Sequence, residues 1–133
     1  MANKSKKKLI VDRYENGIYP HSVLYVAKHA TYDNLKNKFN VTKEDFDGSF
    51  DACLLSGLTN KDKKESCFLV LLDDDLLKRD TAYKIGACAH EALHYTIHLM
   101  EYIEMKMNRT TGEACCYLTE WATKCIYNTL VKW

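Results

Sequence analysis

The chain has 133 residues, of which 47% are hydrophobic and 28% are charged, and its formal net charge at neutral pH is +1. A chain of this length and composition fits one domain around a single core, so we expect one domain over residues 1–133. The near-zero charge gives no electrostatic case for binding to nucleic acid or to an anionic membrane, because such binding needs a concentrated basic surface, and we expect neither partner.

The first eight residues form a lysine-rich tail that we expect to be flexible and solvated. The apolar residues 9–11 that follow are too few for the hydrophobic region of a signal peptide, and no stretch approaches a transmembrane span. We therefore expect a cytoplasmic protein. In that reducing compartment the six cysteines predict small buried hydrophobic side chains rather than disulfides.

Residues 9–14 and 18–26 predict two strands joined by a tight turn. Both segments are rich in β-branched and aromatic residues, and the pair Asn16-Gly17 between them favours the positive φ angles of a two-residue hairpin turn. Pro20 lacks an N–H donor, so we expect the second strand at a sheet edge or bulged near its start. A short helix over residues 31–39 follows, with Thr31 as its cap.

Two further strands are expected at residues 50–58 and 67–72, separated by a charged loop over residues 59–65. The second of these is apolar without alternation, which is typical of a central strand covered on both faces. Three aspartates follow at positions 73–75. They predict a connection and a helix cap rather than a metal site, because no calcium-loop spacing with its glycine follows them.

The longest predicted helix covers residues 81–102, with Asp80 as its cap. On a helical projection an apolar stripe that includes Ile85, Leu93 and Leu99 lies opposite a face of histidines and glutamates. We expect the apolar stripe to pack against the rest of the molecule. The other face is then free for chemistry.

That polar face carries the motif HExxH, in which His90 and His94 flank Glu91. At about 100° of rotation and 1.5 Å of rise per residue, the two histidines lie one turn apart and only about 40° around the helix axis. Two imidazole nitrogens can therefore meet one metal ion. Glu91 lies on the same side, where it can reach a water molecule at that ion.

A catalytic zinc normally takes three protein ligands, so a further donor is needed from another element. We expect a second helix over residues 113–131, which offers Glu113 at its start and Glu120 about two turns further along the same face. Glu113 is the preferred candidate and Glu120 the runner-up. Glu113 can reach the histidines only if the first helix ends near Tyr102 and residues 103–112 loop back across roughly 12 Å.

The motif followed by a glutamate on the next helix resembles the gluzincin zinc peptidases, which have the thermolysin-like ligand arrangement. Residues 113–121, with the pattern ExxxYLxxW, look more specifically like small phage-encoded HExxH proteins. The resemblance covers residues 87–121. It implies His90, His94 and Glu113 as Zn²⁺ ligands and Glu91 as the catalytic base. It departs from the gluzincin pattern at Tyr117, where an acidic residue usually stands.

The sequence thus predicts an α+β fold of minimal zincin type, with a small sheet packed on the long helix and a C-terminal helix closing the site. The predicted function is a zinc-dependent metallopeptidase acting on a peptide or protein substrate. Tyr117, as an oxyanion or ligand partner, and His98, as a proton donor, are further candidate site residues. Two alternatives remain: a non-catalytic zincin fold whose zinc is structural and whose surface binds a protein, and a metal-free helical interaction module.

Overall fold

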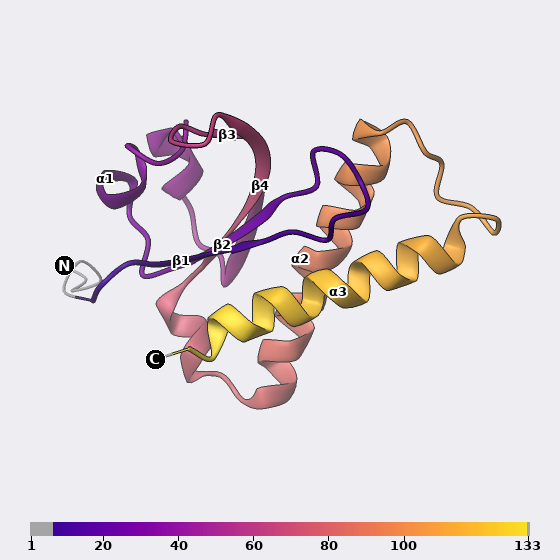
Figure 1. The fold of residues 1–133 in the computed structure, drawn as a ribbon. Helices are drawn as coiled ribbons and strands as arrows, with labels where there is room; N and C mark the ends of the chain where they lie inside the picture. Colours follow the sequence, from indigo (N-terminus) through magenta and orange to yellow (C-terminus); the bar gives the residue numbers. More distant parts are fainter. Residues whose placement is uncertain (1–6, 133) are drawn as a thin grey trace.

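A four-stranded mixed sheet and three α-helices make up the fold in a computed structural model that describes residues 7–132 (Figure 1). The expected α+β class is confirmed. Residues 1–6 of the expected basic tail lie outside the described residues. The elements are β1 (Ile10–Tyr14), β2 (Leu24–Lys28), α1 (Tyr32–Leu35), the 3-10 helix η2 (Lys43–Phe46), β3 (Ala52–Asn60), β4 (Glu65–Leu72), the 3-10 helix η3 (Asp74–Lys78), α2 (Thr81–Tyr102) and α3 (Gly112–Leu130).

The strands lie in the order β1-β2-β4-β3, so β2 and β4 are the interior strands. These two run parallel, whereas β1 and β3 pair antiparallel with them at the two edges. Alternate side chains of a strand point to opposite faces, and both faces of β2 and β4 are buried. The prediction that residues 67–72 form a central strand is confirmed.

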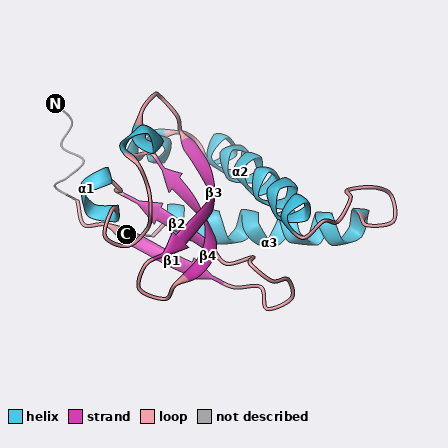
Figure 2. Cartoon of the chain, turned by 90° about the horizontal axis from the view of Figure 1, so that it is seen from above, coloured by secondary structure: helices cyan, strands magenta, loops and turns pink. Residues whose placement is uncertain are grey.

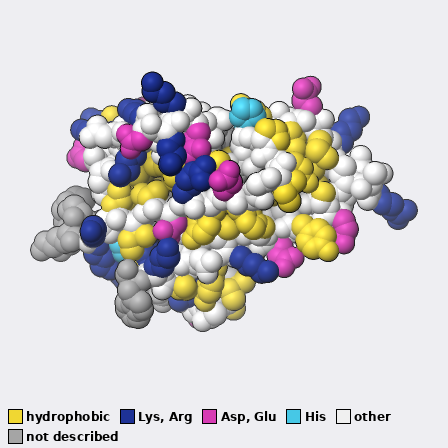
Figure 3. Space-filling model, viewed as in Figure 1, with side chains coloured by type: hydrophobic (Ala, Val, Ile, Leu, Met, Phe, Trp, Pro, Cys, Tyr) yellow, Lys and Arg dark blue, Asp and Glu magenta, His cyan; other side chains and the backbone are white. Residues whose placement is uncertain are grey.

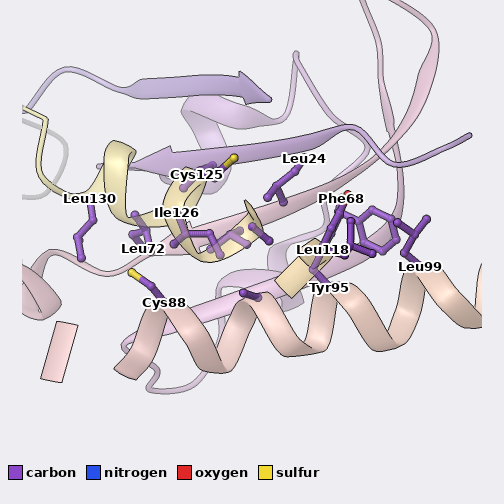
Figure 4. Packing of buried hydrophobic residues seen from close by; sticks show 14 of the residues in the cluster. Leu24, Phe68, Leu72, Cys88, Tyr95, Leu99, Leu118, Cys125, Ile126 and Leu130 are labelled. Carbon is purple, nitrogen blue, oxygen red and sulfur yellow. The ribbon is translucent and has the colours of Figure 1, made fainter. Parts of the chain in front are cut away.

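The larger core lies between the sheet and the two long helices. Figure 2 shows α2 and α3 on one side of the sheet and α1 on the other. Figure 4 shows side chains from α2, α3 and the interior strands meeting in this layer. The buried members are Leu24, Val26, Phe68, Val70, Leu72, Leu76, Cys88, Ala92, Tyr95, Leu99, Leu118, Ala122, Cys125, Ile126 and Leu130. A smaller core on the opposite face packs Leu35 and Phe39 against the sheet.

The prediction of a strand over residues 18–26 was wrong at its start, because β2 begins only at Leu24. Gly17 has a φ of +72°, but Asn16 does not have a positive φ, so a two-residue hairpin turn does not form. Instead the side-chain oxygen of Asn16 accepts hydrogen bonds from the backbone N–H groups of Ile18 and Tyr19, at 2.9 and 3.2 Å. Pro20 therefore lies in a loop, and β2 is an interior strand rather than an edge.

The third strand is displaced from its expected range of residues 50–58. It extends to Asn60, and its register with β4 shifts between Leu55 and Leu58. Gly57, within this bulge, has a φ of +67°, a conformation that side chains with a Cβ rarely adopt. The expected loop over residues 59–65 is correspondingly shorter, since β4 starts at Glu65.

The helix expected over residues 31–39 is only one turn long. Thr31 caps it as predicted, and the side chains of Thr31 and Asn34 form a reciprocal capping box. Phe39 does not continue the helix, because its backbone forms an antiparallel bridge with Asn60. Phe39 therefore lies beside the end of β3 instead of in the helix.

The long helix α2 has the predicted range of residues 81–102, and Asp80 caps it by accepting the Tyr83 N–H at 2.8 Å. Its buried face overlaps the predicted apolar stripe only in part: Leu99 is buried as predicted, but two other members of the stripe are not. Ile85 and Leu93 are each 46% exposed, whereas Tyr95 is fully buried. The sheet lies beneath the Tyr95 side of the helix, where the tyrosine ring packs and its hydroxyl is hydrogen-bonded.

The cysteine and aspartate expectations fit the structure. None of the six cysteines forms a disulfide, and Cys67, Cys88, Cys115 and Cys125 are buried, although Cys116 is exposed. The aspartate run at 73–75 serves the connection to α2, since the carboxylate of the first accepts the backbone N–H of the third at 3.0 Å. Within residues 7–132, no helix has the length and apolarity needed to cross a membrane.

Candidate metal centre

The two motif histidines project from the solvent-facing side of α2 and meet at their tips. Their Nε2 atoms are 3.2 Å apart, and the ring centroids are 4.8 Å apart. Two nitrogens bound to one tetrahedral zinc, each at about 2.0–2.1 Å, are about 3.3 Å from each other. The pair is therefore spaced as two ligands of one zinc ion. The same two nitrogen atoms are also close enough to form a hydrogen bond with each other.

The Glu91 side chain is buried, whereas the two motif histidines are exposed to solvent. Its side chain is 10% exposed, against 68% for the side chain of His90, and a carboxylate oxygen lies 3.9 Å from the His90 Nε2. Burial raises the pKa of the Glu91 carboxyl, while the two motif histidines and the Leu54 backbone N–H act in the opposite direction. The carboxyl is thus a buried proton acceptor at the edge of the histidine pair.

A hollow of about 420 Å³ opens beside this group, between the first half of α2 and the start of β3. His90 and Glu91 line it from the helix, and Asp51 and Ala52 line it from the strand side. Tyr83 forms another wall, and its hydroxyl donates to a carboxylate oxygen of Asp51. His90 and Glu91 therefore face a cleft next to the edge strand β3.

Tyr83 and Asp51 are not among the site residues predicted from the sequence. Tyr83 precedes His90 by seven residues, two helical turns, and its position on the histidine face was the available signal. The Arg79 guanidinium also lies over the Tyr83 ring at 4.3 Å from its centre. No sequence pattern connects Asp51 with this helix, because only the packing of β3 brings it there.

The third metal ligand is not assembled. The first helix ends at Tyr102, as the third-ligand hypothesis requires, but in Figure 1 the following loop swings outward before α3 begins. Among residues 7–132, no group of three or more His, Cys, Asp or Glu side chains is placed so that it could hold a metal ion. Glu113 is exposed, and Glu120 is ion-paired with Lys124 at 3.0 Å. The structure brings together His90, His94 and Glu91 only.

The two remaining candidates lie at the surface. Tyr117 is 66% exposed on α3. His98 stacks on the His94 ring with a centroid separation of 6.4 Å and an interplanar angle of 28°, and its Nδ1 lies 3.8 Å from a Glu101 carboxylate oxygen. The three histidines thus form a row along α2. Only the first two have nitrogens close enough together to share an ion.

Comparison with known proteins gave no match: no protein-family model fits the chain, and neither a curated protein nor a solved structure is significantly similar to it.

Proposed function

We propose that the chain is a zinc-dependent metallopeptidase of zincin type in which His90 and His94 hold the metal. The observation that carries this proposal is the 3.2 Å separation of their Nε2 atoms, which suits two ligands of one tetrahedral ion. Glu113 is proposed as the third ligand, with Glu120 as the alternative. Either would need to approach the pair by a movement of α3 or of the loop before it.

Zinc, when bound, supplies a Lewis acid that makes a water molecule acidic and polarises a carbonyl group. Glu91 accepts the proton of the water that attacks the peptide carbonyl carbon. It then delivers that proton to the leaving nitrogen as the C–N bond breaks. Burial raises the pKa of this carboxyl, which suits both roles because it makes the group a stronger proton acceptor.

The proposed substrate is an extended peptide. Among the described strands none pairs with the outer edge of β3, which the chain covers only at its far end through the bridge of Phe39 to Asn60, and Ala52 at the start of this strand lines the hollow that contains Glu91. A peptide that paired with this edge would run past the histidine pair. The bulge between Leu55 and Leu58 limits regular pairing to the first part of the strand. We further propose that the protein acts in the cytoplasm.

The experiment that tests the proposal combines metal analysis with a glutamate variant. Untagged protein is stripped with chelator, reloaded with zinc and assayed for metal content and for cleavage of a fluorogenic peptide library. We expect one zinc per chain, and we expect Glu91→Gln to keep the zinc while losing at least about 100-fold in turnover. Glu101→Gln, on the same helix and exposed, is the matched control and should retain activity. Equal turnover of wild type and Glu91→Gln would contradict the catalytic role.

A second candidate function is a non-catalytic protein that carries zinc as a structural ion and binds a protein partner. The two-histidine set without a gathered third ligand favours this alternative, because a metal held by few protein ligands can be completed by a partner. Zinc binding without turnover, together with an unchanged biological effect of Glu91→Gln, would support it. Absence of zinc from the reloaded protein would support a metal-free interaction module instead.

A further inference from the structure

A second hollow, of about 660 Å³, lies away from the histidine pair, where the two ends of the described chain come together. Figure 1 shows the start of β1 and the end of α3 on the same side of the molecule, and in Figure 3, in the same view, dark-blue Lys and Arg side chains are visible on that side. Five lysines line this hollow: Lys7, Lys8, Lys28, Lys84 and Lys132. They come from four separate parts of the chain, so only folding places them together.

Acidic side chains neutralise only part of this charge. No aspartate or glutamate is among the described residues that line the hollow. From just outside it, Asp12 pairs with Lys132 at 2.8 Å. Among residues 7–132, Lys7, Lys8 and Lys84 form no ion pair. Within the part of the chain that the structure describes, three ammonium groups around one cavity therefore have no carboxylate partner, although the formal net charge of the whole chain is only +1.

Lys28 gives the hollow a fixed base. It is 1% exposed, and its ammonium group donates to the Leu130 carbonyl at 2.9 Å and to the Lys132 carbonyl. These carbonyls belong to the C-terminal end of α3, where a positive charge is favourable. Lys28 thus holds β2 and α3 together and places a buried positive charge at the hollow. Lys7, Lys8 and Lys84, which form no ion pair within residues 7–132, are the lysines that can meet a ligand.

Apart from His29, whose Nδ1 is paired with Asp74 at 2.7 Å, the rest of the lining is apolar. Ile10 from β1, Leu77 from η3, and Leu130 and Val131 at the end of α3 contribute hydrocarbon surface beside the ammonium groups. A volume of this size lies within the range of about 300–1,000 Å³ that is typical of small-molecule sites. Such a lining suits an anion with an organic body, whose charged end meets the lysines while its body covers the apolar side chains.

We propose that this hollow binds a small organic phosphate of nucleotide size. Lysine ammonium groups bind phosphate as mobile point charges, and three of them are enough to neutralise the roughly two negative charges of a phosphate monoester. A nucleic acid strand fits the same lysines less well. It would require a basic stripe along an extended surface, whereas these lysines surround a single cavity. This site is separate from the proposed zinc centre.

Binding of adenosine monophosphate to the full chain tests the proposal, with adenosine and inorganic phosphate as the comparison probes. We expect a dissociation constant for the nucleotide of about 1 mM or tighter, at least about tenfold weaker binding of adenosine, and weaker binding at high salt. Nuclear magnetic resonance spectra should place the largest amide shifts at Ile10, Leu77, Lys84 and Val131. Shifts centred on His90 would instead contradict the assigned location.

Two lysine variants provide the matched comparison. Lys84→Gln should weaken nucleotide binding about three- to tenfold, because it removes one phosphate contact at the hollow. Lys106→Gln, in the exposed loop before α3, should leave binding unchanged. Equal effects of the two variants would overturn the proposal, as would equal affinities for adenosine and its monophosphate. Tight binding of single-stranded oligonucleotide that the nucleotide fails to displace would assign the lysines to a nucleic-acid surface instead.

Discussion

The Tyr95 hydroxyl on α2 donates a 2.5 Å hydrogen bond to the backbone carbonyl of Ser22, in the loop that precedes β2. The Tyr95 ring is fully buried and packs edge-on against Phe68 with a centroid separation of 5.0 Å. Neighbouring residues of a helix point about 100° apart, so burial of Tyr95 directs His94 toward solvent. The contact therefore fixes both the loop and the rotation of the helix that presents the histidines.

Replacing Tyr95 by Phe should lower the free energy of unfolding by about 1–2 kcal/mol. The ring and its packing are retained, but the Ser22 carbonyl loses its donor, and Asn16 loses an acceptor at 3.3 Å. Urea denaturation followed by circular dichroism measures the difference. Tyr117→Phe removes a hydroxyl from an exposed tyrosine and should have no measurable effect. Equal stabilities of the Tyr95→Phe variant and the wild type would contradict this account.

Glu65 joins three strands through its carboxylate and should make stability depend on pH. Arg13 of β1 donates to both carboxylate oxygens at 3.0 Å, and the Tyr25 hydroxyl of β2 donates at 2.5 Å. The Arg13 guanidinium holds the pKa of the Glu65 carboxyl below its usual value, and the Tyr25 hydroxyl adds to this effect. Glu65→Gln should therefore cost about 1–2 kcal/mol at pH 7, because the group is mostly shielded from solvent.

The sign of the pH dependence follows from the lowered pKa of Glu65 in the folded state. Its stabilising contribution is fully present above the unfolded value of about 4.3 and is lost as the pH falls through the lower folded value. Urea denaturation of wild type and Glu65→Gln should give curves that converge as the pH is lowered below about 4. Glu15→Gln is the control, since this exposed carboxylate also pairs with Arg13 but should contribute less than about 0.5 kcal/mol.

Two glycines should respond in opposite directions to replacement by Ala. Gly86 lies within α2, where an added Cβ meets no atom within 4 Å, so Gly86→Ala should stabilise the chain by about 0.5–1 kcal/mol. Gly57 has a φ of +67° in the bulge of β3, so Gly57→Ala should destabilise it by about 1 kcal/mol. Thermal unfolding of the two variants measures both shifts. Stabilisation by Gly57→Ala would show that the bulge relaxes without strain.

Local patterns made α2 and its cap predictable from the sequence. Asp80 and the spacing of apolar residues act within one element, and both helix ends were found where they were expected. The start of β2 was not predictable in this way. It depends on Asn16, whose side-chain oxygen accepts hydrogen bonds from two backbone N–H groups. It depends also on Ser22, whose backbone carbonyl accepts a hydrogen bond from Tyr95 of the distant helix α2. Such tertiary bonds override the strand propensity of residues 18–23.

In the candidate site, too, features set within one helix were predictable and features set by contacts between elements were not. The spacing of His90 and His94 predicts two converging nitrogens because both lie on one helix, and the structure has them 3.2 Å apart. Asp51, which holds Tyr83 at the wall of the hollow, belongs to a different element and carried no sequence signal. The position of Glu113 depends on the path of residues 103–111, whose turns no periodic pattern describes.

The last prediction separates the candidate metal ligands by zinc affinity, measured by competition with a chromophoric chelator. His90→Ala and His94→Ala should each weaken binding by at least about 100-fold, because a single imidazole would remain of the converging pair. His98→Ala should leave the affinity within about threefold of wild type, since its ring stacks on His94 without sharing the ion.

Glu113→Gln and Glu120→Gln then assign the third ligand. If Glu113 closes on the histidines when zinc binds, its replacement should weaken binding about 10- to 100-fold, whereas loss of Glu120 should only free Lys124 from its ion pair. The reverse result would make Glu120 the ligand. Unchanged affinity in both variants would show that the histidine pair binds zinc without α3, as the structural-zinc alternative requires. The five histidine and glutamate variants together thus distinguish a three-ligand zincin site from a two-histidine surface site.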